Sequence, residues 1–408
     1  MRSAALIRLW LSDTGSRLGF QVVEFLLPVT AVLAVHATST EVGLVTAVQF
    51  LPVALFSLSA GSLVARYSPT LLLLISNLGR LFCVGYLAVS AAFGHLSLAD
   101  LMIAGFVVGT TMIMYDVTFQ TTIPRVIDQE RLQSANGILQ ASVAVVQLAA
   151  PALAGFLIGW VGASGSFMAA AGLFLLVALG FAMRISTSAD GESARRVSVI
   201  QGLKYTWQDR YIRAICLQAG IFNLHEQAFL TVFLVYGLRG AGFSSAQVGF
   251  TVGASSAGAL LGALAAGRLA RRFHFGRLVT LALPGAAVAL LVASCLPGRL
   301  SIIAFLIAFF VDGVGLGIYN VNAISLRQLA PPARFLPSVT AASRMVGFGT
   351  IPLGALLGGL LLARFGGRAA LVAIAASLLL LTFQMLFTPV RSLSSLEGFR
   401  SSALARTA

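Results

Sequence analysis

Residues 300–326 read LSIIAFLIAFFVDGVGLGIYNVNAISL, an apolar run that contains one charged side chain, Asp312. About 20 mainly apolar residues in a helix are enough to cross the hydrocarbon core of a bilayer. Similar runs follow one another along the 408 residues, of which 58% are hydrophobic and 10% are charged, and the mean hydropathy is +0.94. Soluble domains carry roughly a quarter charged residues. The composition therefore predicts an all-α protein that crosses the membrane many times.

Charged residues, Gly and Pro between the apolar runs mark the ends of twelve predicted transmembrane helices. One long polar stretch separates the sixth helix from the seventh. We therefore predict an N-terminal six-helix half (1–184), a cytoplasmic linker (185–212), a C-terminal six-helix half (213–390) and a cytoplasmic tail (391–408). The predicted helices are 14–35, 42–65, 70–93, 98–122, 134–159, 164–184, 213–238, 246–269, 276–296, 300–326, 338–363 and 366–388.

The distribution of basic residues predicts the orientation. With both ends in the cytoplasm, twenty of the 27 Lys and Arg side chains fall in cytoplasmic segments and four in outer loops. The other three, Arg17, Arg80 and Arg344, fall inside helices. Twenty-six of the 27 are Arg, which is typical of a GC-rich bacterial source. We expect a multi-pass protein of the bacterial inner membrane with both termini cytoplasmic.

Several classes of partner are not indicated. The net charge of +14 resides in short connectors without interleaved aromatic side chains, so it does not predict a nucleic-acid partner. Cys83, Cys216 and Cys295 lie far apart and have no metal-ligand spacing. Lys204, the single lysine, fits no phosphate-binding Gly-x-x-x-x-Gly-Lys-Ser/Thr loop. We expect no cofactor and no metal; the expected partners are the lipid bilayer, a small-molecule substrate and protons.

The two halves resemble each other weakly, at a constant offset of 206 residues. Glu41-Val42-Gly43 recurs as Gln247-Val248-Gly249, and Ala60-Gly61-Ser62-Leu63 recurs as Ala266-Gly267-Arg268-Leu269. Two related halves are typical of secondary transporters that rock around a site near the middle of the membrane.

Short fragments along most of the chain match one transporter family. They include Arg8-Leu9-Trp10-Leu11, Gln49-Phe50-Leu51-Pro52, Gly79-Arg80, Ala135-Asn136, Ala150-Pro151-Ala152-Leu153-Ala154-Gly155, Tyr319-Asn320-Val321-Asn322-Ala323 and Pro352-Leu353-Gly354-Ala355. In this order the fragments resemble the major facilitator superfamily, and within it the branch of drug and siderophore exporters that includes the enterobactin exporter and macrolide efflux pumps.

The resemblance implies a single chain that is functional as a monomer, with helices 1 and 7 equivalent and lining a central cavity. Gly61, Leu63 and Arg66 match the cytoplasmic gate motif of the superfamily, Gly-x-Leu-Ala-Asp-Arg. Ala65 stands where that motif has its acid, and Phe20 stands where the branch often has an acid in helix 1.

Ionisable side chains in the membrane interior cost roughly 2.5–3.5 kcal/mol on insertion scales, so they need a partner, a wet cavity or a function. Glu24 in helix 1 and Glu226 in helix 7 lie well inside the predicted spans. We expect both to take up and release protons or to bind a cationic part of the substrate; the structural alternative is an ion pair, such as Glu24 with Arg17. Polar residues that share their helix faces, and that we expect to line the cavity, are Arg17, Gln21, Asn223 and Gln227.

Other polar residues of the spans have two roles open to them. Asp312 either lines the cavity or makes a buried hydrogen bond, and the glycines that follow it permit bending or close helix approach. Tyr319, Asn320 and Asn322 either bind substrate or satisfy backbone groups. We expect Asp116 and Arg80 to pair. The residues assigned to gating or structure are Gly61, Arg66, Arg80, Asp116 and Arg344.

These features favour a secondary active transporter over an enzyme. The predicted function is proton-coupled export of a small amphipathic molecule such as a siderophore, an antibiotic or another secondary metabolite, with the direction taken from the resemblance. A proton-coupled importer is the alternative. A lipid-modifying membrane enzyme would need a paired base and nucleophile or a metal cluster, and the four His residues are scattered. A non-transporting sensor is the remaining class.

Overall fold

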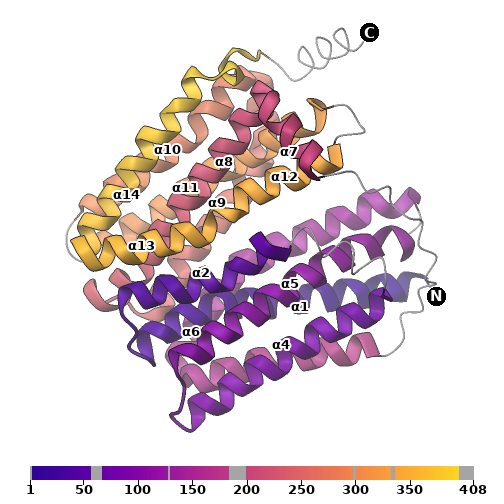
Figure 1. The fold of residues 1–408 in the computed structure, drawn as a ribbon, viewed down its shortest axis with the longest axis vertical. Helices are drawn as coiled ribbons and strands as arrows, with labels where there is room; N and C mark the ends of the chain where they lie inside the picture. The colour runs from indigo at the N-terminus through magenta and orange to yellow at the C-terminus, as the bar shows by residue number, and fades with distance from the viewer. Residues whose placement is uncertain are drawn as a thin grey trace. The chain divides into compact units, whose positions relative to one another are not determined.

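The computed structural model describes residues 2–56, 67–126, 129–182, 199–296, 300–331 and 336–394. Over these ranges the chain is almost entirely helical and contains no strand, which confirms the predicted all-α class. The chain divides into two compact units (Figure 1). Unit 1 comprises Met1–Ala194 with Ser244–Phe250, and unit 2 comprises Arg195–Phe243 with Thr251–Ala408.

Eleven helices of the described ranges are long and apolar enough to cross a membrane. The apolar part of one of them, α6 (Gln129–Ala182), runs over 40 residues from Ala141 to Gly180. At 1.5 Å per residue this is about twice the ~30 Å thickness of the hydrocarbon core. Gly162 breaks α6 with φ of 69°, a conformation that costs little without a Cβ atom. The break lies between the predicted helices 134–159 and 164–184, so twelve crossings fit the chain.

Unit 1 contains α1 (Arg2–Leu33), α2 (Ser39–Phe56), α4 (Pro69–Ala92), α5 (Leu98–Val126) and α6. Both α1 and α4 pack on α6, and α2 packs on α5. Tyr115 and Phe119 of α5 stack at 5.8 Å between ring centroids, in a buried cluster with Leu73 of α4 and Val177 of α6. The core of this unit is therefore aromatic and lies between helices that are distant in sequence.

Unit 2 contains α7 (Val199–Gln208), α8 (Arg210–Val235), α9 (Ser245–Arg272) from Thr251 onward, α10 (Phe275–Cys295), α11 (Leu300–Leu329), α12 (Leu336–Gly349), α13 (Ile351–Phe365) and α14 (Gly367–Thr382). A π-helical turn (Tyr236–Gly240) extends α8, and two short 3-10 turns (Phe383–Phe387 and Pro389–Ser392) follow α14. α8 packs against α12, α13 and α14, and α10 packs against α11 and α14 (Figure 1).

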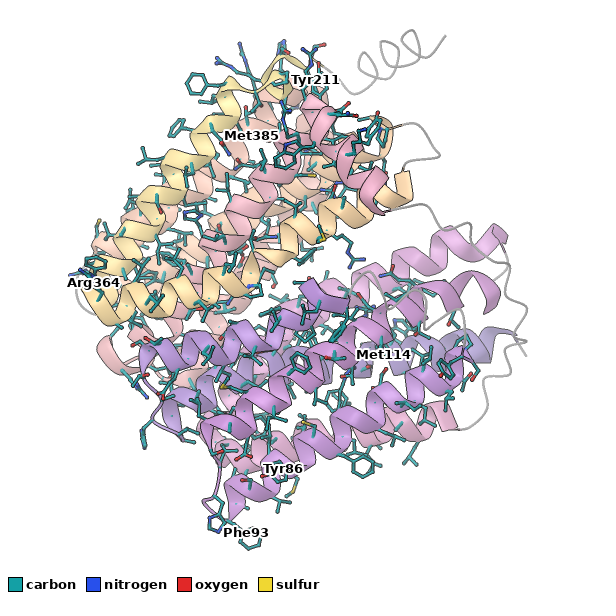
Figure 2. All side chains as sticks on the ribbon, in the orientation of Figure 1. Tyr86, Phe93, Met114, Tyr211, Arg364 and Met385 are labelled. Carbon is teal, nitrogen blue, oxygen red and sulfur yellow. The ribbon has the colours of Figure 1, made fainter. Side chains whose placement is uncertain are left out.

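Apolar side chains cover the outer faces of the helices as well as the core. Phe82, Phe93 and Trp160 in unit 1, and Leu380 in unit 2, are large hydrophobic side chains that remain exposed. Figure 2 shows side chains projecting outward along the helices, Phe93 among them at 73% exposure. A protein that is apolar both inside and outside suits a lipid environment.

Small residues set the closest helix contacts, as expected for membrane bundles. In unit 1 a Cβ atom at Gly109 of α5 would overlap the carbonyl oxygen of Gln49 of α2. In unit 2 a Cβ atom at Gly313 of α11 would overlap the carbonyl oxygen of Ser255 of α9. Gln49 and Ser255 are 206 residues apart, the offset at which the sequence fragments recur. The same helix crossing therefore occurs in each unit.

The structure differs from the predicted elements in three main places. α1 begins at Arg2, before the predicted start at residue 14. α7 lies within residues 185–212, which we predicted as a polar linker; its ten residues are too few and too polar to register as a span. The predicted helix 338–363 consists of α12 and α13, which are separated at Thr350. Thr350 Oγ1 donates to the carbonyl oxygens of Gly220 and Gly347 at 2.9 and 2.8 Å, and this side-chain bonding competes with the continuous helix.

The first turn of α8 depends on an N-cap. A carboxylate oxygen of Asp209 accepts hydrogen bonds from the backbone N–H groups of Tyr211 and Ile212, each at 2.9 Å. We expect Asp209→Ala to lower the stability of the purified protein by about 1 kcal/mol, because two helix N–H groups lose their acceptor. Thermal unfolding in detergent measures this, and Asp209→Asn, which keeps an acceptor, is the control. Equal melting temperatures for Asp209→Ala and wild type would contradict the role.

Candidate functional site

An ion-pair cluster begins the polar stripe of α1. Arg17 Nε donates to both carboxylate oxygens of Asp13 at 3.0 Å, and Arg17 Nη2 donates to Oδ1 of Asp116 on α5 at 2.8 Å. The Asp13 side chain is 1% exposed, that of Arg17 16% and that of Asp116 22%. Our predictions paired Asp116 with Arg80 and gave Arg17 as the structural partner of Glu24. The difference arises because helix rotation, which spacing along the chain does not give, decides which side chains meet.

Arg80 lies at the centre of unit 1 and its side chain is fully buried. Its guanidinium donates to Ser16 Oγ at 2.8 Å, to the carbonyl oxygen of Thr111 at 3.0 Å and to Thr111 Oγ1 at 3.2 Å. Aromatic faces complete its surroundings and favour the cation. The ring centroids within 6 Å of its Cζ belong to Tyr115 (5.1 Å), Phe174 (5.7 Å) and Phe20 (5.9 Å).

Glu24 lies two turns beyond Arg17 on α1 and is half-buried. Its Oε2 accepts a hydrogen bond from Gln21 Nε2 at 3.0 Å. Because Arg17 is engaged by the two aspartates, the hydrogen-bond partner of Glu24 on its own helix is a neutral amide. Within the predicted polar stripe, Gln21 therefore forms a hydrogen bond with Glu24. Arg17 forms ion pairs with Asp13 and Asp116 instead.

The polar residues of α8 also divide by role. Asn223 Nδ2 donates to the carbonyl oxygen of Gly347 at 2.9 Å, so Asn223 ties α8 to α12. His225 is buried and its Nδ1 contacts the carbonyl oxygen of Ile221 at 2.7 Å. Glu226 and Gln227 are half-buried. The expected cavity face of α8 therefore includes one residue, Asn223, that already has a structural hydrogen bond.

α8 and α11 run antiparallel, in a register that brings Glu226 opposite Asp312. Three contacts define the register: Tyr319 Oη donates to the carbonyl oxygen of Ile215 (2.8 Å), Phe229 faces Phe309 (6.0 Å between centroids) and Phe233 faces Phe305 (5.0 Å). Glu226 precedes Phe229 by three residues and Asp312 follows Phe309 by three, so both carboxyl groups lie on the contact face. The register therefore places Glu226 and Asp312 opposite one another along the two helices.

Asp312 is held at the contact of α11 with α9. Asp312 is 2% exposed, and its neighbour Gly313 touches the backbone of Ser255 on α9. Asp312 Oδ1 is buried and has no hydrogen-bond partner among the described residues. Gly313, beside it, allows the backbones of α9 and α11 to touch. Of the roles that we left open, Gly313 therefore has the close helix approach, and the two roles of Asp312 stay predictions.

The remaining predicted cavity residues of α11 point to different surroundings. Tyr319 is buried and bonds the backbone of α8, and buried Asn322 donates to the carbonyl oxygen of Ile318 at 2.7 Å. Both side chains therefore donate to backbone carbonyl groups, which is one of the two roles that we left open for them. Asn320 is exposed.

The predicted gating residues are only partly described. Gly61 and Arg66 lie outside the described residues, as does Ala65. Arg344 of α12 is exposed, and its Cζ lies 6.0 Å from the ring centroid of Phe348. The assignment of these residues to gating stays a prediction.

Asp13, Ser16, Thr111 and Ser255 of this polar framework were not predicted. Asp13 lies four residues before Arg17, a spacing that signals a helical ion pair, but the predicted first helix began after it. Ser255 is one of many small residues in α9, and no signal in the sequence separates it from the others.

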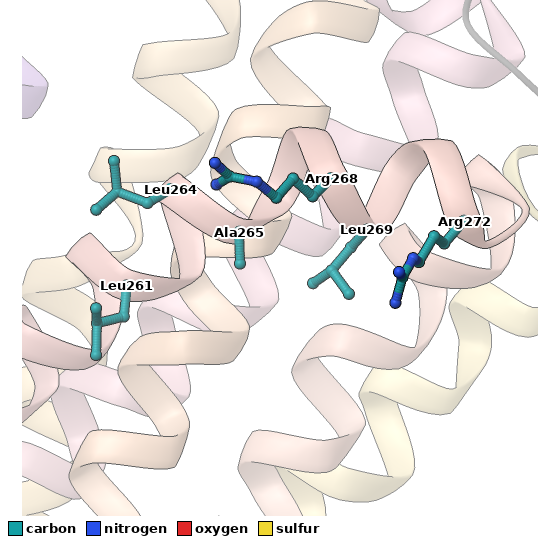
Figure 3. A pocket seen from close by; sticks show the side chains of 6 residues that line it. All are labelled: Leu261, Leu264, Ala265, Arg268, Leu269 and Arg272. Carbon is teal, nitrogen blue, oxygen red and sulfur yellow. The ribbon is translucent and has the colours of Figure 1, made fainter.

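A surface pocket lies elsewhere, along α9. Its volume is ≈ 670 Å³, and Figure 3 shows the side chains that line it, including the two cations Arg268 and Arg272 one turn apart. The other lining residues are Leu261, Leu264, Ala265 and Leu269. None of the predicted cavity residues lines this pocket.

Comparisons with known proteins agree with this fold. The family model described as Major Facilitator Superfamily matches residues 9–355. An uncharacterized MFS-type transporter, y4rN, of Sinorhizobium fredii (strain NBRC 101917 / NGR234) is 24% identical over 370 residues, which cover 88% of each chain.

Among solved structures, a bacterial homologue of the iron transporter ferroportin in its inward-facing state has a TM-score of 0.76 at 15% identity, covering 94% of this chain and 97% of that chain. A D-xylose-proton symporter has a TM-score of 0.68 at 14% identity, covering 96% and 100%. At these identities the structural similarity shows the fold alone. The match of the family model over most of the length shows that this chain belongs to the major facilitator superfamily.

Proposed function

We propose that this secondary transporter is a proton-coupled exporter, which exchanges a small amphipathic molecule from the cytoplasm for incoming protons. It acts as a monomer in the inner membrane with both termini in the cytoplasm. The expected substrates are siderophores, antibiotics or other secondary metabolites. The direction and the substrate class rest on the resemblance of the sequence fragments to the exporter branch.

The balance of charges inside the two units carries the proton-coupling proposal. In unit 1 the carboxylates of Asp13 and Asp116 are matched by the guanidinium groups of Arg17 and Arg80. Among the residues that the structure describes, the hydrogen-bond partner of Glu24 is the amide of Gln21. In unit 2 neither Glu226 nor Asp312 makes an ion pair with any residue that the structure describes.

Carboxyl groups that lack a cationic partner inside a membrane cost least as neutral acids. Such a group becomes neutral when it binds a proton. It can ionise again only when water or a cationic ligand reaches it. Glu24 and Glu226 therefore have the surroundings that a proton carrier needs, whereas Asp13 and Asp116 are neutralised permanently by arginine. This contrast supports the assignment of Glu24 and Glu226 to coupling, and of Arg80 and Asp116 to structure.

The test is proton flux in everted membrane vesicles that hold a proton gradient, with candidate siderophores and drugs added. We expect substrate to dissipate the gradient with wild-type protein, and Glu226→Gln to reduce this response to the level of vesicles without the protein. A permanently neutral amide keeps the size of the side chain but carries no proton. Substrate should accumulate inside the vesicles if the protein exports; release of preloaded substrate with the gradient would instead identify an importer.

Glu41→Gln provides a matched control. Glu41 caps α2 by accepting from the backbone N–H and the hydroxyl of Thr38, at 2.6 and 2.8 Å. The equivalent position at the start of α9 is already glutamine, and Gln247 accepts from the N–H of Ser244 at 2.8 Å. The control therefore removes one carboxylate without removing a cap, and it should retain full flux. A gradient that fails to respond to any substrate that the protein binds would refute proton coupling.

A further inference from the structure

The register of α8 and α11 places the carboxyl groups of Glu226 and Asp312 opposite one another, and the described residues of unit 2 give neither of them an ion-pair partner. The aromatic contacts of Phe229 with Phe309 and of Phe233 with Phe305 lie on one side of the pair, and the hydrogen bond of Tyr319 lies on the other. We propose that Glu226 and Asp312 form a single proton-binding site, in which the two carboxyl groups share one proton. The carboxylate of one residue accepts the proton that the carboxyl group of the other donates.

The unpartnered oxygen of Asp312 points to an occupant. Oδ1 is buried in a side chain that is 2% exposed, and no described residue donates to it. A buried carboxylate oxygen without a donor is unfavourable, because it loses its hydration without gaining a hydrogen bond. A proton held between the carboxyl groups supplies the missing hydrogen bond and removes one of the two like charges. Bonds between an acid and a carboxylate are among the strong, charge-assisted hydrogen bonds.

Within the described residues of unit 2, no other ionisable group compensates this pair. The helices packed around it carry no titratable side chain over residues 251–267 of α9, 278–294 of α10, 351–363 of α13 and 369–387 of α14. On α12 the one charged residue, Arg344, is exposed. On α8 and α11 the titratable neighbours are His225, which contacts the carbonyl oxygen of Ile221, and Tyr319, which bonds the carbonyl oxygen of Ile215. With both acids ionised, the interface would hold two uncompensated negative charges.

The proton is favoured over a metal ion as the occupant. Oxygen-binding metal ions such as Ca²⁺ take six to eight ligands, or about six for Mg²⁺. The site offers two carboxyl groups, and the described residues contain no group of three or more His, Cys, Asp or Glu side chains that could hold a metal. The site therefore lacks the ligands for a metal but has a donor and an acceptor for one proton.

The experiment is thermal unfolding of the purified full-length protein in detergent at about pH 6 and about pH 9, without substrate. Raising the pH removes the shared proton and places two like charges across the interface, so the wild-type melting temperature should fall. Glu226→Gln and Asp312→Asn each leave one carboxyl group, and each should reduce this fall by about 5 °C or more. The double variant should add little beyond either single variant, because the two groups act as one site.

Two controls make the outcome decisive. Glu41→Gln removes a carboxylate elsewhere and should keep the wild-type fall. The exchanged variant, Glu226→Asp with Asp312→Glu, keeps both carboxyl groups and should also keep the wild-type fall in melting temperature. This variant tests the pair even if one of the neutral variants folds poorly. Equal falls in wild type and both neutral variants would overturn the proposal. Recovery of the wild-type melting temperature at about pH 9 by NaCl but not by choline chloride, absent in the variants, would replace the proton by a metal cation.

This inference rests on the proposed function only where it assigns the shared proton to the coupling of transport. The two can fail separately, because the unfolding experiment uses no substrate. An intact pH effect of the pair without substrate-driven proton flux would reject proton-coupled transport and keep the site. Flux that Glu226→Gln abolishes, together with no pH effect of the pair, would reject the shared proton and keep the transport.

Discussion

Replacement of Gly313 by alanine should prevent most of the protein from folding. A Cβ atom at this position would overlap the carbonyl oxygen of Ser255 and would lie 2.9 Å from the backbone nitrogen of Ala259. Both are backbone atoms of α9, so no side chain can rotate away, and the two helices would have to separate. Overpacking of a protein core typically lowers the free energy of unfolding by about 1–3 kcal/mol. We expect a loss of about 3 kcal/mol or more here, because two backbones clash. Gel filtration of detergent-solubilised protein should show a large loss of the monodisperse fraction.

Gly267→Ala is the matched control on the partner helix. A Cβ atom at Gly267 of α9 has nothing within 4 Å, and alanine is the better helix former by about 1 kcal/mol. The control should fold at least as well as wild type. If Gly313→Ala also retained the wild-type yield and melting temperature, the backbones of α9 and α11 would have to be farther apart than the structure places them, and the position of Asp312 against Ser255 would need revision.

Replacement of Arg17 by methionine should destabilise unit 1 by about 3–5 kcal/mol, the usual cost of breaking a buried ion pair from one side. The variant leaves the carboxylate of Asp13 buried without its cation, at 1% exposure, and removes the 2.8 Å contact to Asp116. Asp116 is more exposed, so most of the loss should come from Asp13. A lower melting temperature of the purified variant is the expected measurement.

A second substitution separates the charge effect from lost packing. Asp13→Asn in the Arg17→Met background removes the stranded charge and should recover most of the stability. Arg391→Met, at an exposed position near the end of the described chain, should change it by no more than about 0.5 kcal/mol. If the double variant were no more stable than Arg17→Met alone, the loss would be due to packing of the long side chain, and the ion-pair account of unit 1 would be wrong.

These experiments probe two different ways of keeping charge inside a membrane protein. Unit 1 pairs each described buried acid of its cluster with arginine and surrounds Arg80 with hydroxyl groups and aromatic rings. Unit 2 places Glu226 and Asp312 opposite one another instead. Permanent cations hold a structure at every pH, whereas a site that depends on a proton responds to the proton gradient. The arginine pairs therefore stabilise unit 1, whereas the proposed coupling sites are Glu24 in unit 1 and the pair of Glu226 and Asp312 in unit 2.

Much of the fold was predictable because it depends on local properties of the sequence. Length and hydropathy of each run are enough to identify a membrane-spanning helix, and Gly162 falls between two predicted helices. The functional candidates Glu24, Glu226 and Asp312 were also predictable, since a carboxyl group inside an apolar run is recognisable without its neighbours. α7 was missed because an amphipathic surface helix of ten residues has no such signal.

The sequence by itself determined the membrane class, the positions of most apolar helices and which residues within them are ionisable. Only the tertiary structure decided the partner of each: Arg17 with Asp13 and Asp116, Arg80 with Ser16 and Thr111, and Glu226 opposite Asp312. The physical reason is the range of the interactions. Hydrophobic transfer into the bilayer acts on each helix separately. Partners on different helices, such as Arg80 with Thr111 at a separation of 31 residues and Arg17 with Asp116 at 99, meet only after helix packing fixes rotation and register.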